Sequence, residues 1–490
     1  MPPKKHILDN EDQQKFEYLP LTVILIVSII LRLAWFNAMV ERDEGLFAIQ
    51  GKLLLNQGSG SILTNKPPLL TLIYGIIGKF FGETLIPVRI FNNLLFILSV
   101  ILFYIFIYEE YDKKIAILAT FFYSLLMNLP IFEGMLAMSE SLSIFPIMMS
   151  VYLFYHYEKR QRYILLLSSI LFASVGFLIK FSNIFVLLVF LSYLGYKKEL
   201  NLKKVFLIML IFLFIPLIIH FSSAYLIGSS YYLGIWPTLV RFYSTKLSHY
   251  VPWQFTLFLI LESSFFLFLL LMGIVVTIRN GRAFSKKINL LFFLWLLVGL
   301  LFCFIPPSFG HYFIVILPPL AFYSARGMSF LIQIKKVYIK LGLMILLIIA
   351  AFTTLFFTSK QYPDYNINYK IFNFPYSDFS GAEEQNKVIS FIKEHTNSTD
   401  RILVYGWAGE IYFLSQKDPF KALRFVCYSD DPNPNLNSID HDKQLEQWNP
   451  KLLIVMPQYP LECNGKKLFQ DFIANSTLYQ IGNVKIYIKK

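Results

Sequence analysis

Long apolar runs separated by short polar segments fill most of the first 360 residues, and this pattern limits the fold more than any other feature. A helix needs about 20 apolar residues to cross a hydrocarbon core of about 30 Å. Candidate spans lie near residues 19–38, 86–108, 115–133, 141–157, 163–179, 182–196, 205–226, 254–278, 289–305, 311–331 and 337–357. Only 15% of the 490 residues are charged, against about a quarter in soluble domains. The sequence therefore predicts an α-helical polytopic membrane protein with about 11 to 13 transmembrane helices.

The net charge of +13 arises largely from short basic clusters between the apolar runs. If residues 1–18 are a cytoplasmic tail, the loops "EKRQR", "YKKELNLKK" and "RNGRAFSKK" all fall on the cytoplasmic side, as the positive-inside rule requires. Residues 68–82 must then not cross the bilayer, and we expect an interfacial helix along the outer surface. The charge is explained by membrane orientation, so it does not indicate a nucleic-acid partner.

The chain becomes more polar after about residue 358, and helical and strand patterns alternate. Helices are expected at 383–396 and 441–448, and strands at 401–407, 421–428, 451–456 and 484–490. This alternation predicts a small α/β domain over 358–490. An odd number of crossings places it outside the cytoplasm, after a transmembrane domain over 19–357. Cys303, Cys427 and Cys463 show no CxxC spacing, and at most the last two could form a disulfide.

Ionisable side chains gather in the segments that this topology places outside. The first outer loop, 39–85, holds Arg42, Asp43, Glu44 and Lys66, and later outer segments hold Glu133, Glu140, Lys180, Arg241, His311 and Tyr312. Carboxylates at the end of a membrane helix are costly to bury, which favours a functional role. The alternative for Asp43 and Glu44 is charge at the first turn of an amphipathic helix, "DEGLFAIQGKLLL". Lys180 is interpreted as an anchor that snorkels to the interface.

Motifs of soluble enzymes are absent from the sequence. There is no GxGxxG with a following acid, no Walker loop, no GxSxG and no HExxH. Nucleotide-driven pumping and dinucleotide chemistry therefore have no support. An inverted pair of broken helices, which would favour a secondary transporter, is also missing.

Several of these segments together resemble one enzyme class. "ERDEGLFAIQGKLLLNQG", "NKPPL", "MSESL", "GFLIKFSN" and "HYFIVILPPLAFYSA" are similar to motifs of the GT-C class of glycosyltransferases, in the branch that contains protein O-mannosyltransferases and the lipid A aminoarabinose transferase. The resemblance covers roughly residues 20 to 330. It implies a GT-C fold with outer juxtamembrane helices, in an enzyme of the cell membrane. Such an enzyme takes a sugar from a polyprenyl-phosphate donor and passes it to a lipid, glycan or protein acceptor at the outer face.

The resemblance also implies roles for individual residues. Asp43 corresponds to the catalytic acid/base residue, Glu44 to its neighbour at the acceptor, and Lys66 to a cation near the donor phosphate. Glu133 and Glu140 occupy the second acidic motif, where the family often has Asp. Glu140 is the candidate ligand if a divalent cation such as Mg, Mn or Zn is needed, and the metal requirement stays open.

The chemistry of the residues agrees with this assignment. A carboxylate must accept the proton of an acceptor hydroxyl, and cations or polar groups must stabilise the departing phosphate. Asp43 suits the first task in an inverting displacement. The second falls to Lys66, with Arg241, His311 and Tyr312 as further donor-phosphate candidates.

Two alternatives belong to other functional classes. A lipid or oligosaccharide transporter or flippase would use the same outer charges, but it also needs polar groups near the bilayer midplane, where Arg32 and His220 are the clearest of few candidates. A scaffold that presents the C-terminal domain leaves the paired carboxylates unexplained.

Overall fold

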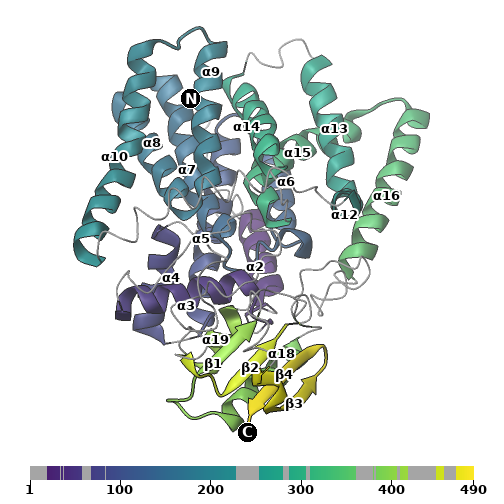
Figure 1. The fold of residues 1–490 in the computed structure, drawn as a ribbon. Helices are drawn as coiled ribbons and strands as arrows, with labels where there is room; N and C mark the ends of the chain where they lie inside the picture. The colour runs from purple at the N-terminus through teal and green to yellow at the C-terminus, as the bar shows by residue number, and fades with distance from the viewer. Residues whose placement is uncertain are drawn as a thin grey trace, which may run out of the picture.

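A bundle of long helices makes up most of the protein, with a small α/β unit at one end (Figure 1). The structure is a computed structural model. It describes residues 19–57, 68–227, 253–279, 286–304, 310–359, 379, 382–405, 409–417, 448–456 and 471–490, apart from positions 34, 37 and 83.

The expected helices of the bundle are present. They are α2 (Leu19–Leu33), α5 (Ile86–Tyr108), α6 (Lys113–Leu126), α7 (Ser139–Arg160), α8 (Tyr163–Ile179), α9 (Phe185–Tyr196), α10 (Leu202–Ile227), α12 (Trp253–Glu262), α13 (Ser264–Arg279), α14 (Lys287–Cys303), α15 (Leu317–Gln333) and α16 (Val337–Ser359). The expected span at 254–278 is divided at Ser263, whose hydroxyl bonds the Leu259 carbonyl, a contact that often bends helices.

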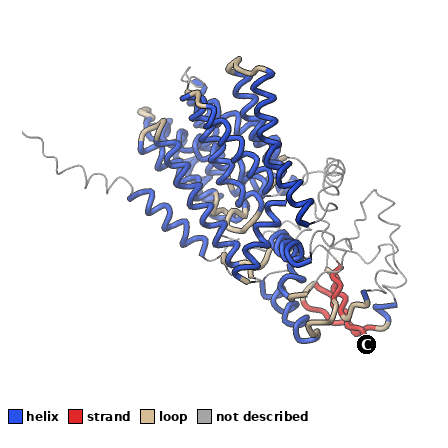
Figure 2. The backbone as a smooth tube through the Cα atoms, turned by 90° about the vertical axis from the view of Figure 1, so that its left-hand side faces the viewer, coloured by secondary structure: helices blue, strands red, loops and turns tan. Residues whose placement is uncertain are grey.

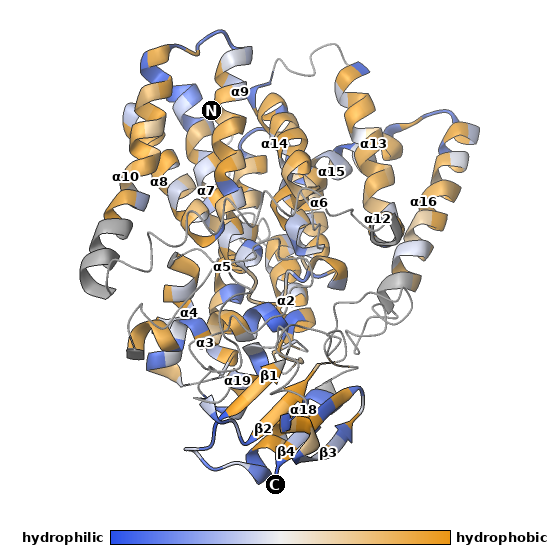
Figure 3. Ribbon diagram, viewed as in Figure 1, coloured by the Kyte–Doolittle hydropathy of each residue, from blue (hydrophilic) through white to orange (hydrophobic). Residues whose placement is uncertain are grey.

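Length and composition suit several of these helices to a bilayer. Among the described residues, Ile86–Tyr108, Gly310–Gln333 and Val337–Phe356 are long and apolar enough to cross one, and shorter apolar helices accompany them. Figure 3 shows apolar residues along the bundle and polar ones mainly at its ends. These features indicate a membrane protein, while the direction in which each helix crosses stays a prediction.

Arg89 and a group of basic side chains around Glu110 lie at opposite ends of the bundle. Arg89 lies near the start of α5 and Glu110 just after its end, so a rise of 1.5 Å per residue separates them by about 30 Å. Lys159 Nζ donates a hydrogen bond to Glu110 Oε1 at 2.6 Å, and Lys286 Nζ donates one to the Glu110 carbonyl. These bases therefore share the end remote from Arg89. The α9–α10 loop also lies at the end opposite the α/β unit (Figure 1).

Two helices from the first outer loop lie where the bundle meets the α/β unit. α3 (Arg42–Gln57) runs across the end of the bundle, and α4 (Pro68–Phe81) packs beside it. The predicted helix is confirmed, but α3 is buried on more than one face, since residues 47–51 are all buried along with Leu53 and Leu54. A helix at 68–82 is also confirmed, and its place on a membrane surface stays a prediction.

The C-terminal part forms a four-stranded sheet with helices (Figure 2). Its elements are α18 (Ala382–His395), β1 (Ile402–Tyr405), α19 (Gly409–Ser415), β2 (Leu452–Val455), β3 (Ser476–Ile481) and β4 (Val484–Lys489). The strand order is β1-β2-β4-β3; β1 and β2 are parallel, and the other pairs are antiparallel. The predicted helix at 383–396 and three of the predicted strands are confirmed, whereas α19 and β3 were not predicted. The strand expected at 421–428, nearly all of the helix expected at 441–448, and Cys427 and Cys463 lie outside the described residues.

One hydrophobic core joins the α/β unit to the first outer loop. Phe47 and Ile49 of α3 belong to the same buried cluster as Ile411 of α19 and Ile454 of β2. The C-terminal unit is therefore packed directly onto the helix whose first turn contains Asp43.

Candidate active site

A buried ion pair fixes the start of α3. Arg89 Nη2 lies 2.5 Å from Glu44 Oε2, and Arg89 Nε donates to Glu44 Oε1 at 3.1 Å. The Ala137 N–H also donates to Glu44 Oε1, at 2.9 Å. Glu44 is 0% exposed and Arg89 1%. Charges this deeply buried persist only with close pairing and further hydrogen bonds, and the two-point geometry supplies both.

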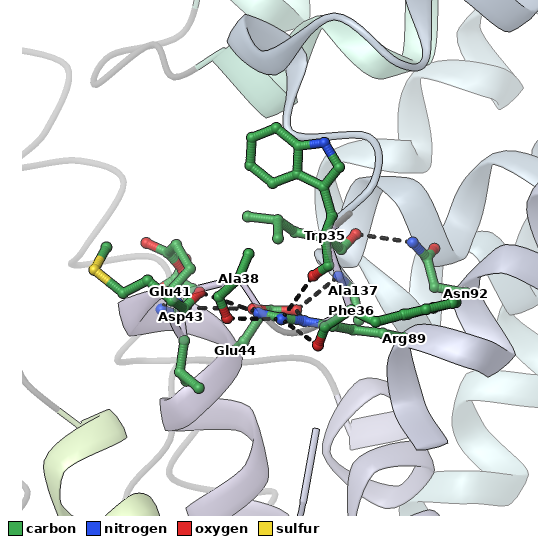
Figure 4. Close-up of polar contacts among 12 residues, drawn as sticks. Trp35, Phe36, Ala38, Glu41, Asp43, Glu44, Arg89, Asn92 and Ala137 are labelled. Atoms are coloured by element: carbon green, nitrogen blue, oxygen red, sulfur yellow. Dashed lines mark hydrogen bonds and ion pairs between the residues drawn. The ribbon is translucent and has the colours of Figure 1, made fainter. Parts of the chain in front are cut away.

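The remaining donors of Arg89 hold the loop between α2 and α3 (Figure 4). Nη1 donates to the carbonyls of Trp35, Phe36 and Ala38, each at 3.0 Å, and Nη2 donates to that of Met39 at 3.1 Å. Arg89 was missed as a site residue from the sequence. The sequence feature that could have identified it is its position as a single charged residue near the start of an apolar span, because such charges rarely lack a partner.

Glu41 caps α3. The Asp43 N–H donates to Glu41 Oε2 at 2.5 Å, and the Glu41 N–H donates to Glu44 Oε2 at 3.4 Å. This reciprocal arrangement resembles a capping box, except that the Glu41 side chain accepts from the second helical N–H and not from the third. It fixes the backbone at Asp43, whose side chain is partly exposed. Glu41 stands in the motif "ERDEGL" but was not selected from the sequence.

The environment of Glu41 favours its neutral form. Burial raises the pKa of Glu41 to about 8, and the charges of Asp43 and Glu133 act in the same direction, while Arg42 and His311 oppose them. A carboxyl with this pKa keeps its proton at neutral pH. Glu41 can thus lie beside Asp43 without a second full negative charge.

The raised pKa of Glu41 predicts a specific dependence of stability on pH. Below pH 4.5 both the folded and unfolded states hold the proton; between 4.5 and about 8 only the folded state keeps it. The free energy of unfolding therefore falls as pH rises through this window. Glu41→Gln cannot ionise, so its melting temperature should rise relative to that of the wild type from pH 5 to pH 8, measured by thermal unfolding in detergent.

Glu110→Gln is the matched control for this experiment. Burial acts to raise the pKa of Glu110, but hydrogen bonds from Lys159 and Tyr155 outweigh it and lower the pKa. Glu110 is therefore ionised in both states above pH 5, and its substitution should shift the melting temperature by a constant amount. If the melting temperature of Glu41→Gln also differs from that of the wild type by a constant amount between pH 5 and pH 8, the raised pKa of Glu41 is contradicted.

A second polar cluster joins segments from three later parts of the chain. His311 Nδ1 lies 2.7 Å from Glu133 Oε2, and His311 Nε2 lies 3.8 Å from Glu140 Oε1. Lys180 forms an ion pair with Glu140, and its ammonium lies 3.8 Å from the centre of the Tyr312 ring. Lys180 is thus held inside the cluster by a carboxylate and an aromatic face, rather than acting only as the anchor that the sequence suggested.

A close backbone contact explains how His311 reaches Glu133. A Cβ atom at Gly310 would lie 1.7 Å from the Ile131 carbonyl oxygen, so only glycine permits this approach. Glu133 itself has φ of 53°, a left-handed conformation that is uncommon outside glycine. The turn after η3 (Pro130–Phe132) and the start of η5 (Gly310–Ile316) are thereby brought together.

The candidate residues fall into two neighbouring groups. Asp43 and Glu44 belong to the group at α3, and Glu133, Glu140, His311 and Tyr312 belong to the second cluster. The Ala137 N–H, from the segment between Glu133 and Glu140, donates to Glu44 Oε1 at 2.9 Å, which places the two groups near each other. Lys66 and Arg241 lie outside the described residues.

The donor set around Glu140 does not fit a metal ion. Glu140 Oε2 accepts a hydrogen bond from the Ser139 hydroxyl at 2.6 Å, and Oε1 pairs with the Lys180 ammonium. A cation already occupies the position that a metal would take. Within the described parts of the chain, no group of three or more His, Cys, Asp or Glu side chains is arranged to hold a metal ion.

Comparisons with known proteins point to membrane glycosyltransferases. Residues 65–221 match the family described as dolichyl-phosphate-mannose-protein mannosyltransferase. ArnT from Cupriavidus metallidurans in the apo state is 12% identical, with a TM-score of 0.59, over 95% of this chain and 97% of that chain. ArnT bound to undecaprenyl phosphate is also 12% identical, with a TM-score of 0.58 and the same coverage. A search of curated proteins gave no significant match.

A third similar structure comes from an archaeon. The oligosaccharyltransferase of Archaeoglobus fulgidus, tethered to an acceptor peptide, is 12% identical with a TM-score of 0.58, over 96% of this chain and 74% of that chain. The family match and these solved structures agree with the resemblance found in the motifs. The chain therefore has the GT-C fold of membrane glycosyltransferases.

Proposed function

We propose that this protein is a glycosyltransferase that moves a sugar from a polyprenyl-phosphate donor to an acceptor hydroxyl at the outer face of the membrane. The observation that carries the proposal is the assembly of Asp43 and Glu41 beside the His311 cluster, on a GT-C fold. The ArnT structure with undecaprenyl phosphate supports a polyprenyl phosphate as the carrier. The acceptor class, whether lipid, glycan or protein, stays open.

Asp43 is proposed as the general base. Its carboxylate accepts the proton of the acceptor hydroxyl while the acceptor oxygen forms a bond to the anomeric carbon. The bond between that carbon and the phosphate oxygen breaks at the same time, so the configuration inverts and polyprenyl phosphate leaves. The capping contacts of Glu41 hold the Asp43 backbone, which favours a fixed approach of base to acceptor.

The second cluster is proposed to receive the departing phosphate. His311 and Tyr312 would donate hydrogen bonds, and Lys180, held by Glu140, would contribute positive charge. Lys66 and Arg241 remain candidates for the same task. Preorganised donors and cations of this kind stabilise charge that develops on a leaving group.

The contacts of Glu44 favour a supporting role over the predicted contact with the acceptor. Both of its carboxylate oxygens already accept hydrogen bonds, and the side chain is completely buried. We propose that Glu44 positions α3 by pairing with Arg89, so that Asp43, its neighbour, faces the acceptor.

The outer location rests on the arrangement of the bundle. The α9–α10 loop, which contains "YKKELNLKK", lies at the end opposite the α/β unit (Figure 1). If basic loops face the cytoplasm, then Asp43 and the C-terminal unit face outward. A lipid-borne donor suits this side because it can enter laterally from the bilayer.

The test is to incubate the purified protein with a panel of polyprenyl-phosphate sugars, with and without a chelator. We expect one donor to be consumed, with free polyprenyl phosphate as a product and no loss on chelation. A transporter would instead move the intact donor across liposomes without cleaving the sugar–phosphate bond. Failure to cleave any donor while moving one would contradict the proposal.

A further inference from the structure

The α/β unit holds the loop before Asp43 through one buried glutamine. Gln385 lies on α18 and is 2% exposed. The Val40 N–H donates to Gln385 Oε1 at 3.1 Å, and Gln385 Nε2 donates to the Val40 carbonyl at 3.0 Å. The partners are 345 positions apart in the sequence. Both contacts involve only the main chain of Val40, so they fix the backbone whatever side chain stands there.

This contact adds to the hydrogen bonding of an irregular segment. Loop backbone that packs between two structural units must satisfy its polar groups without a helix or a sheet. Arg89 supplies donors for the carbonyls of Trp35, Phe36, Ala38 and Met39, and Gln385 satisfies both groups of Val40. The loop is therefore held on one side by α5 and on the other by the C-terminal unit.

A second contact lies just beyond Asp43. A Cβ atom at Gly45 would lie 2.3 Å from the Cα of Glu410, so only glycine allows α3 and α19 to approach this closely. Val40 and Gly45 flank Asp43 in the sequence. Asp43 thus lies between two backbone positions that the α/β unit holds.

We propose that Gln385 is a positioning residue for sugar transfer, and that the α/β unit acts through it to hold Asp43 in the reactive geometry. This inference rests on the proposed function of Asp43 as general base. A small displacement of a reacting group is sufficient to slow the chemical step, since an error of about 1 Å can cost about 10²-fold in rate. Gln385 contacts the loop of the base and not the cluster assigned to the donor phosphate, so its effect should fall on kcat.

The experiment compares Gln385→Met with Glu384→Met. Glu384 is the adjacent residue, is also buried, and accepts a hydrogen bond from the Asn483 N–H at 2.6 Å within the α/β unit. The same replacement therefore breaks a contact to the Asp43 loop in one variant and an internal contact in the other. Melting temperatures of both variants show how much each substitution destabilises the protein.

We expect Gln385→Met to lower kcat by about 10- to 100-fold with a donor KM within about twofold of the wild type. Glu384→Met should keep nearly the wild-type kcat when corrected for the folded fraction. Gln385→Glu retains the acceptor for Val40 N–H but loses the donor to its carbonyl, so its kcat should lie below that of the wild type. Equal losses in the two Met variants, in proportion to their melting temperatures, would overturn the proposal.

Hydrogen exchange gives a second measurement that does not depend on sugar transfer. Gln385→Met should speed exchange of the Val40 and Asp43 amides, whereas Glu384→Met should speed that of Asn483. Unchanged exchange at Val40 in Gln385→Met would overturn the inference even if the enzyme is active. If the wild type transfers no sugar from any donor, the proposed function fails, and the role of Gln385 in transfer fails with it. The exchange measurement still tests the contact between Gln385 and Val40 by itself.

Discussion

Replacing Asp43 with Asn is expected to lower kcat by about 10²- to 10⁴-fold, the usual contribution of a general base. Asn keeps the size of the side chain and can still accept a hydrogen bond, but it cannot take a proton from the acceptor. Because α3 is capped by the Glu41 side chain, the substitution should leave the melting temperature within a few degrees of the wild type. The measurement is steady-state transfer with the donor identified in the panel.

The matched control for this substitution is Asp112→Asn. Asp112 is exposed, and it caps α6 by accepting a hydrogen bond from the Ile115 N–H at 2.9 Å. The change is chemically identical and lies just beyond the other end of α5, so transfer should be unaffected. A folded and fully active Asp43→Asn variant would sink the assignment of Asp43 as the base.

Replacing Arg89 with Met is expected to destabilise the protein by about 3–5 kcal/mol, because it leaves the Glu44 carboxylate buried without its partner. The carbonyls of Trp35, Phe36, Ala38 and Met39 also lose this donor. We expect sugar transfer to be lost with the loop geometry. Denaturant unfolding in detergent, followed by tryptophan fluorescence, measures the change.

Two further variants separate charge from geometry at this ion pair. Arg89→Lys keeps the charge but cannot reproduce the flat two-point contact with Glu44, so its stability should fall between those of the wild type and Arg89→Met. Glu44→Gln combined with Arg89→Met removes the unpaired charge and should be more stable than Arg89→Met alone. Arg160→Met, at an exposed position, serves as the control. If Arg89→Met unfolds at the same denaturant concentration as this control, the ion pair is not important for stability.

The sequence alone determined the class of structure, because the signals for it are local. A run of about 20 apolar residues predicts a helix whatever surrounds it, and α5 and α16 appear where their runs predicted. The motif "ERDEGL" with "NKPPL" likewise indicated the GT-C resemblance, and it made Asp43 a candidate base, a role that stays a prediction. The apolar residues of "DEGLFAIQGKLLL" also predicted a helix at this position, and α3 lies there.

Short elements with weak patterns could not be predicted in the same way. α19 has only seven residues, too few for a helical period to be distinct from chance. β3 is largely exposed, so it lacks the alternation of buried and exposed side chains that marks a half-buried strand.

The partners within the site were decided only by the tertiary structure. Arg89 and Glu44 are 45 positions apart, and Gln385 and Val40 are 345 apart. No local period relates such residues, because packing of helices and of the α/β unit brings them together. Packing then sets their chemistry: the surroundings of Glu41 raise its pKa, and both carboxylate oxygens of Glu44 accept hydrogen bonds from structural groups. The sequence thus indicated which residues are candidates, and the fold decided that Glu44, of the two adjacent acids, is buried and paired with Arg89 while Asp43 stays partly exposed.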